Sequence, residues 1–205
     1  MGYCGEYTAV KSEEQATVAV SLRCRSWNCI HCQPTRKSGL IANAIGGVPN
    51  KMLTLTHRAS PDFTPEQAAK RLSWAWRICR KRLMRKHKWK SLPFLAVIEK
   101  HKSGWPHIHI LLRTPFIPWF EIRDIMKELI DSPRVRIEQI SKFSQVCGYC
   151  AKYCGKAVEK FQSAKRYWQS RDYDLRDDDE KPDYQKEKGG WEIISTPLAL
   201  LAQYR

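Results

Sequence analysis

Hydrophobic and polar residues alternate in several short stretches of the chain, and each stretch predicts a β-strand with one face on the core. These stretches lie at 17–23, 52–56, 94–99, 107–113, 134–140, 165–171 and 191–195. Lys102-Ser103-Gly104 follows the third of them and predicts a tight turn into the fourth. Because such a turn joins antiparallel strands, we expect a largely antiparallel sheet.

Apolar residues recur every three to four positions in other parts of the chain, which predicts helices at 35–45, 65–87, 118–130 and 144–161. Thr64-Pro65-Glu66-Gln67 has the composition of a helix start, with Thr64 as the N-cap and Pro65 in the first position. Helices combined with antiparallel strands predict an α+β fold, with helices packed on the sheet.

Length and charge narrow the class of protein. We expect the 205 residues to form a main domain over 48–205 and a small cysteine-rich appendage over 1–47. The net charge of +15 suits a polyanionic partner such as nucleic acid, although ribosomal proteins and membrane-surface binders have a similar charge. Without an apolar span or a signal peptide, the sequence predicts a cytoplasmic protein that does not bind membranes, with reduced or metal-bound cysteines.

The stretch from Trp105 to Leu112 carries the first candidate chemistry. His107 and His109 are two positions apart, so in a strand both imidazoles project from the same face. Ile108 and Ile110 then face the core. Paired imidazoles on a rigid strand make half of a divalent metal site.

A candidate nucleophile lies in the last predicted helix. Tyr149, Lys152, Tyr153 and Lys156 fall within one arc of that helix, opposite an arc that contains Cys147, Cys150 and Cys154. The cysteine arc is interpreted as the packed face, because free cysteine packs as a small hydrophobe. The alternatives are that the tyrosines belong to the core and that these cysteines bind a metal.

Three motifs stand in a defined order: the strand Leu53-Thr54-Leu55-Thr56, then His107-Ile108-His109, then the Tyr149 to Lys156 segment. In this order the chain resembles the HUH endonuclease superfamily, specifically the rolling-circle replication initiators of small plasmids and single-stranded DNA phages. The resemblance implies a ferredoxin-like five-stranded antiparallel sheet. It also implies that the protein nicks and rejoins single-stranded origin DNA through a covalent 5′-phosphotyrosine, with a host helicase and polymerase completing replication.

The catalytic roles follow from the same resemblance. Tyr149 is the preferred nucleophile, Tyr153 a second one, and Lys152 and Lys156 their partners. Glu99, at the end of the neighbouring strand, is the expected third ligand beside the two histidines, and this mixed nitrogen and carboxylate set suits Mg²⁺ or Mn²⁺. His57 and His101 are competing ligands. The expected DNA contacts are Thr54, Thr56, Trp105, Arg166, Trp168 and Arg171.

The N-terminal cysteines have a spacing close to that of structural zinc sites. Cys24, Cys29 and Cys32 supply three thiolates and Cys4 is the expected fourth, which predicts one structural Zn²⁺. His31 is an awkward alternative ligand, and free cysteines are the other interpretation.

Two further functions remain open on the sequence. One is a single-strand transposase or relaxase of the same chemistry, although the paired tyrosines and the order of the motifs favour an initiator. The other is a noncatalytic zinc-dependent nucleic-acid-binding protein, which would bind DNA without forming a covalent product.

Overall fold

The computed structural model describes residues 4–12, 17–142, 144–146, 161, 164–176 and 192–201. The chain divides into two compact units, one formed by Met1–Gly39 with Asp177–Arg205 and the other by Leu40–Arg176. The strands are β1 (Thr8–Ser12), β2 (Thr17–Ser21), β3 (Lys51–Thr56), β4 (Phe94–Lys100), β5 (Pro106–Leu112), β6 (Val135–Gln139), β7 (Tyr167–Gln169) and β8 (Glu192–Ile194). The helices are α1 (Cys32–Gly46), α2 (Pro65–Lys86), α3 (Trp119–Ile130) and α5 (Leu198–Leu201).

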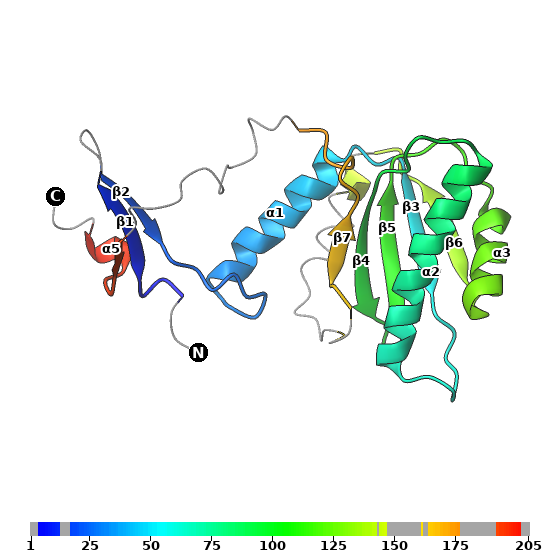
Figure 1. Cartoon of the computed structure of the whole chain (residues 1–205), viewed down its shortest axis with the longest axis horizontal. Coiled ribbons are helices and arrows are strands. Elements are labelled where there is room, and N and C mark those ends of the chain that lie inside the picture. The colour runs from blue at the N-terminus through cyan, green and yellow to red at the C-terminus, as the bar shows by residue number, and fades with distance from the viewer. Residues whose placement is uncertain are drawn as a thin grey trace. The chain divides into compact units, whose positions relative to one another are not determined.

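A five-stranded sheet with the order β6-β3-β5-β4-β7 is the centre of the second unit (Figure 1). Every neighbouring pair is antiparallel, which confirms the expected α+β fold and its five-stranded antiparallel sheet. The sheet is built around the predicted hairpin, since β4 and β5 pair from Phe94 opposite Leu112 to Lys100 opposite Pro106.

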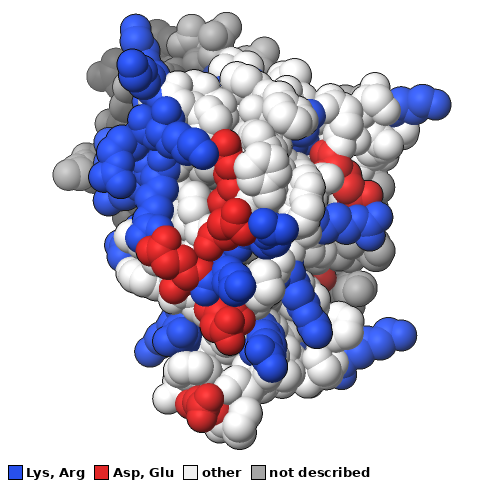
Figure 2. Space-filling model, turned by 90° about the vertical axis from the view of Figure 1, so that its right-hand side faces the viewer, with Lys and Arg blue, Asp and Glu red and all other residues white. Residues whose placement is uncertain are grey.

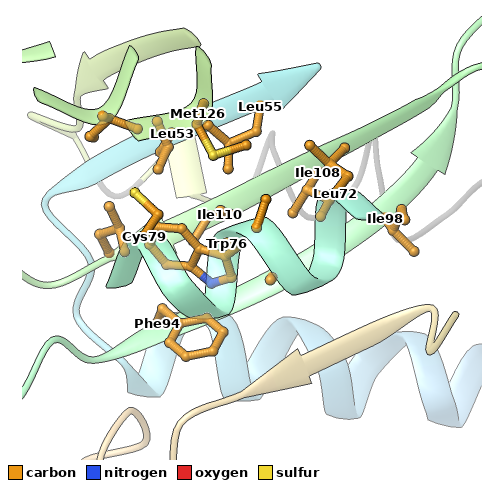
Figure 3. Close-up of a cluster of buried hydrophobic side chains, with 14 of the residues drawn as sticks. Leu53, Leu55, Leu72, Trp76, Cys79, Phe94, Ile98, Ile108, Ile110 and Met126 are labelled. Atoms are coloured by element: carbon orange, nitrogen blue, oxygen red, sulfur yellow. The ribbon is translucent and has the colours of Figure 1, made fainter. Parts of the chain in front are cut away.

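Alternation along the strands gives this sheet one apolar face, and α2 and α3 cover it (Figure 1). Leu53, Ile108 and Ile110 project from this face, and Trp76 and Leu72 of α2 pack against them (Figure 3). The predicted start of α2 is confirmed in detail. The Thr64 hydroxyl accepts a hydrogen bond from the Gln67 amide at 3.2 Å, and the Gln67 side chain accepts one from the Thr64 amide at 2.8 Å.

Hydrogen bonds hold the segment after β7 against the rest of the second unit. Tyr173 is fully buried and its hydroxyl donates to the Ala44 carbonyl at 3.0 Å. The Arg113 guanidinium donates to the carbonyls of Gly47, Asp172 and Tyr173. A side chain at Gly47 would overlap the Tyr173 ring, so this close approach requires glycine.

The first unit contains a three-stranded antiparallel sheet with the order β2-β1-β8. The sequence predicted strands near β2 and β8, but it predicted neither β1 nor the pairing of Ala9 in β1 with Ile193 in β8. Thr8 is buried, and its hydroxyl donates to the Thr196 carbonyl at 2.7 Å. Residues far apart in the sequence therefore build this small sheet together.

No helix in the described part of the chain is long and apolar enough to cross a membrane. Basic side chains crowd one margin of the surface seen in Figure 2, while acidic and basic side chains are mixed over its centre. The helix expected over 144–161 lies outside the described residues except for 144–146 and 161.

Candidate active site and cysteine cluster

The face of the five-stranded sheet opposite α2 carries the predicted histidines. In the antiparallel register, Thr54 lies opposite His109 and Thr56 opposite His107. On the other side of β5, Glu99 lies opposite His107. Directly opposed residues point to the same face, so three neighbouring strands bring these five polar side chains together.

Each histidine is held by a threonine hydroxyl. The distance from Thr56 Oγ1 to His107 Nδ1 is 2.7 Å, and that from Thr54 Oγ1 to His109 Nδ1 is 3.2 Å. The two imidazole rings are nearly parallel, at 14°, with centroids 6.4 Å apart. A hydrogen bond at Nδ1 orients the ring and favours Nε2 as the metal-binding nitrogen.

Glu99 lies close to one of the two histidines. Its Oε2 lies 3.7 Å from His109 Nε2, and both side chains are about one-tenth exposed. Ligand atoms about 2.1 Å from one ion are separated by about 3 Å when adjacent and about 4.2 Å when opposite, so this distance fits a shared ion. Two imidazoles and a carboxylate on one face suit a divalent cation.

The two competing histidines differ in position. His57 is buried beside Trp105, with ring centroids 6.0 Å apart, and its Nδ1 donates to the Arg58 carbonyl. It contributes nothing to the cavity that His107 and His109 line. His101 lies next to His107, with centroids 4.6 Å apart, and its Nδ1 accepts from the Ser103 amide at 3.4 Å. His101 is therefore the only one of the two near the predicted ligands.

The surroundings of His107 favour its neutral form. Burial is the main cause that lowers the pKa of His107 to about 4, and the nearby His101 and Arg134 contribute in the same direction. Metal binding needs a neutral imidazole. His107 is thus prepared as a ligand over the whole neutral range of pH.

A cavity of about 530 Å³ opens over this face of the sheet. His107, His109 and Glu99 line it, together with a basic rim formed by Lys100, Lys102, Arg134 and Arg136. The sequence analysis missed this rim. The alternation of polar and apolar residues over 134–138 could have revealed it, because Arg136 lies opposite Thr54 in the pairing of β6 with β3. Such a rim suits a phosphate backbone.

The structure separates the predicted DNA contacts. Thr54 and Thr56 contact the histidines, as described above. Trp105 is half-buried against His57. Trp168 lies opposite Ala96 in the register and packs against the apolar core, so it is on the other face from His107. Arg171 is exposed after β7, and Arg166 lies just before it, where its carbonyl accepts from Ile98.

The predicted nucleophilic segment, with Tyr149, Lys152, Tyr153 and Lys156, lies outside the described residues. Cys147, Cys150 and Cys154 lie there too. Cys79 is described, and it is fully buried in the core, where burial raises its pKa to about 12.

The four N-terminal cysteines form a cluster in the first unit. The Sγ atoms of Cys4, Cys24, Cys29 and Cys32 all lie within 4.8 Å of one another. Cys32 Sγ is 3.2 Å from Cys4 Sγ and 3.7 Å from Cys24 Sγ. Four thiolates bound tetrahedrally at 2.3 Å would be about 3.8 Å apart, so the cluster is compatible with structural zinc.

The thiols of this cluster differ in acidity. The Cys24 backbone amide and the Cys32 thiol stabilise the Cys4 thiolate and lower its pKa to about 6. Burial raises the pKa of Cys32 to about 12. Arg36 braces the loop between the ligands: it donates to the Arg25 carbonyl at 2.7 Å, and its guanidinium lies 5.0 Å from the ring centroid of the buried Trp27.

The family model for replication-associated protein ORF2/G2P matches residues 50–158, more than half of the chain. The chain belongs to this family. The matched region of this replication-associated protein begins just before β3 and includes Glu99, both histidines and the expected tyrosine segment. No curated protein and no solved structure matches the chain. Membership of this family indicates a role in DNA replication.

Proposed function

We propose that this replication-associated protein starts rolling-circle replication by nicking and rejoining single-stranded origin DNA. The observation that carries the proposal is the set of His107, His109 and Glu99 on one face of the sheet, under a cavity with a basic rim. In the proposal His107 and His109 bind Mg²⁺ or Mn²⁺ through Nε2, and Glu99 is the third ligand. The bound cation would neutralise charge on the scissile phosphate.

Threonine hydroxyls and basic side chains prepare this face for a DNA strand. Thr54 and Thr56 fix the two rings, so little reorganisation is needed when the ligand set assembles. The exposed Arg134 and Arg136 would contact phosphates next to the scissile one. A single strand can follow such a cavity with its phosphates toward the protein.

Tyr149 is the proposed nucleophile. Its hydroxyl oxygen forms a bond to phosphorus while the bond from phosphorus to the 3′ oxygen breaks. The tyrosine hydroxyl gives its proton to solvent, and the departing 3′ oxygen takes one up from solvent to become a 3′-hydroxyl that a host polymerase can extend. Since free tyrosine has a pKa of about 10, the attack needs a charged neighbour, and Lys152 is the proposed one.

Tyr153 is proposed to attack the next strand, with Lys156 in the part of Lys152. The residues are about one helical turn apart, so both could approach the same phosphate. Rejoining is the reverse reaction, in which a 3′-hydroxyl attacks the phosphotyrosine and releases the tyrosine. The cysteine cluster has no part in these steps and would stabilise the first unit by binding zinc.

Tyrosine variants test the proposed order of events. We expect Tyr149→Phe to keep a reduced covalent adduct through Tyr153, and the double phenylalanine variant to form none. Each single variant should nick DNA but fail to transfer a strand from one tyrosine to the other. Full nicking, joining and turnover by Tyr153→Phe would contradict the two-tyrosine mechanism, and full activity of Tyr149→Phe would move the nucleophile to Tyr153.

A further inference from the structure

A second cavity, of about 400 Å³, lies between α2 and β7 at the edge of the sheet. It is on the helix-covered face, because Trp168 and Phe94 line it and both belong to the apolar side of the sheet. The histidines project from the opposite face. This α2–β7 pocket is therefore separate from the candidate active site.

One side of the α2–β7 pocket is a stripe of cations on α2. Lys70, Arg77 and Lys81 recur at helical spacing, are exposed, and line the pocket with the exposed Lys165 across from them. Within the described residues, none of these cations forms an ion pair with an acidic side chain. Their positive charge is available to an anionic ligand.

Arg80 has a different role in the same wall. It donates to the Leu92 carbonyl at 2.8 Å, and its guanidinium lies 5.2 Å from the ring centroid of Phe94. Burial lowers the pKa of Arg80, and the nearby Asp172 opposes that change. Arg80 thus stabilises the pocket wall, whereas Lys70, Arg77 and Lys81 are exposed to solvent.

Two pocket-lining residues of α2 also carry buried hydrogen-bond donors. Ser73 Oγ and Trp76 Nε1 have no hydrogen-bond partner in the described part of the chain, and Trp76 is 1% exposed. Trp76 projects from α2 toward Phe94 (Figure 3), and their ring centroids are 5.5 Å apart. Buried donors without partners are rare in folded proteins, and each one calls for an explanation such as a bound water or ion.

We propose that the α2–β7 pocket binds one nucleotide of a DNA strand, with its base against Trp168 and its phosphates on Arg77 and Lys81. The pocket has the volume of a small-molecule site, an aromatic wall and uncompensated cations, a combination typical of single-strand binding. An acidic peptide would use the cations but not the aromatic wall. The proposal needs DNA as the ligand but does not depend on nicking.

Charge reversal in the full-length protein tests the phosphate contacts. Arg77→Glu/Lys81→Glu is compared with Lys88→Glu/Lys90→Glu, which changes the net charge equally at exposed residues outside the pocket. Binding of a labelled single-stranded oligonucleotide is measured by fluorescence anisotropy in chelator, in the background Tyr149→Phe/Tyr153→Phe. This background prevents covalent capture, so the result stands whether or not the protein nicks DNA.

We expect the pocket variant to bind at least tenfold more weakly, and its dependence of log K on log salt to fall by about 0.7 per lost phosphate contact. The control should lose less than threefold. Equal losses in both variants would overturn the proposal. Circular dichroism checks folding, and Arg77→Gln/Lys81→Gln is the milder variant if the first one unfolds.

Trp168 variants test the base contact. Trp168→Leu should lower affinity about tenfold, while Trp168→Phe keeps an aromatic face and should bind nearly as the parent does. Unchanged binding in both would reject stacking at this position. If the pocket variants lose affinity for dATP or for an acidic peptide but keep it for DNA, the pocket serves that other ligand and the proposal is wrong.

Discussion

The cysteine cluster and the histidine face differ in the type and number of their candidate metal ligands and in the elements that supply them. The cysteines are four soft thiols from a loop-rich segment, with sulfur atoms close enough for all to bind one ion. The histidine face offers two imidazoles and a carboxylate on neighbouring strands. Four thiolates close a tetrahedral zinc site, whereas three mixed ligands leave positions open.

Their surroundings differ in the same sense. The sulfur atoms all lie within 4.8 Å of one another, while the histidines line a cavity of about 530 Å³ with a basic rim. Metal in the first place would stabilise structure, and metal in the second would meet a substrate. In the proposed function, the two uses of a metal ion would be divided between the two units of the chain.

Removal of one cysteine thiolate should give the largest effect on structure, and it tests whether the cysteine cluster binds a structural zinc ion. We expect Cys29→Ser to lose the bound zinc and the fold of the first unit, because metal binding and folding are coupled in such sites. His31→Ala is the matched control, since His31 stands between two ligands but outside the sulfur cluster. Elemental analysis and hydrogen exchange measure the outcome. Equal zinc content in Cys29→Ser and the parent would contradict a zinc site here.

Loss of a supporting hydroxyl should have a smaller effect on the histidine face. Thr56→Val removes the hydrogen bond to His107 Nδ1 with little change in volume. We expect Mn²⁺ affinity to fall by about 10- to 100-fold, with recovery in Thr56→Ser, because groups behind the ligands tune metal affinity by that much. Calorimetric titration measures it. Equal affinity in all three proteins would show that Thr56 does not orient a ligand.

The smallest expected effect concerns the pH dependence of the metal-free protein. Since the pKa of His107 is lowered from 6.5 to about 4 in the folded state, the unfolded chain binds more protons between these values. The contribution of His107 to the free energy of unfolding is therefore full above about pH 6.5 and is lost as the pH falls toward 4. In denaturant unfolding with chelator present, the free energy of unfolding of His107→Gln should fall less steeply between pH 6.5 and 4 than that of the parent. Identical pH profiles of the two proteins would contradict the lowered pKa.

The alternation of polar and apolar residues was enough to predict that His107 and His109 share one face of the sheet. The period of two in His107-Ile108-His109 fixes which side chains share a face, and the turn at Lys102-Ser103-Gly104 fixes the neighbour of that strand, so Glu99 could be placed near them. The start of α2 could also be predicted from the local sequence, because its capping box lies within four residues.

Pairings between distant strands escaped prediction. A strand pattern does not name its partner, so the pairing of β1 with β8 and of β6 with β3 could not be derived. The contact of Thr56 with His107 depends on the pairing of β3 with β5, and the approach of Arg134 to His107 depends on the pairing of β6 with β3. Trp168 was expected near DNA without a face assigned to it, and only the register with Ala96 places it on the helix-covered side.

Formation of a covalent adduct tests the central claim most directly. The full-length protein is incubated with Mn²⁺ and a random pool of single-stranded DNA labelled at the 3′ end, and products are separated on a denaturing gel. The account predicts a labelled protein–DNA band in the parent. In His107→Ala/His109→Ala it should be about a thousandfold weaker, because a catalytic cation is worth several kcal/mol, while binding of DNA remains. An adduct formed at the parental rate by the double variant, or no adduct from a parent that binds the DNA, would contradict it.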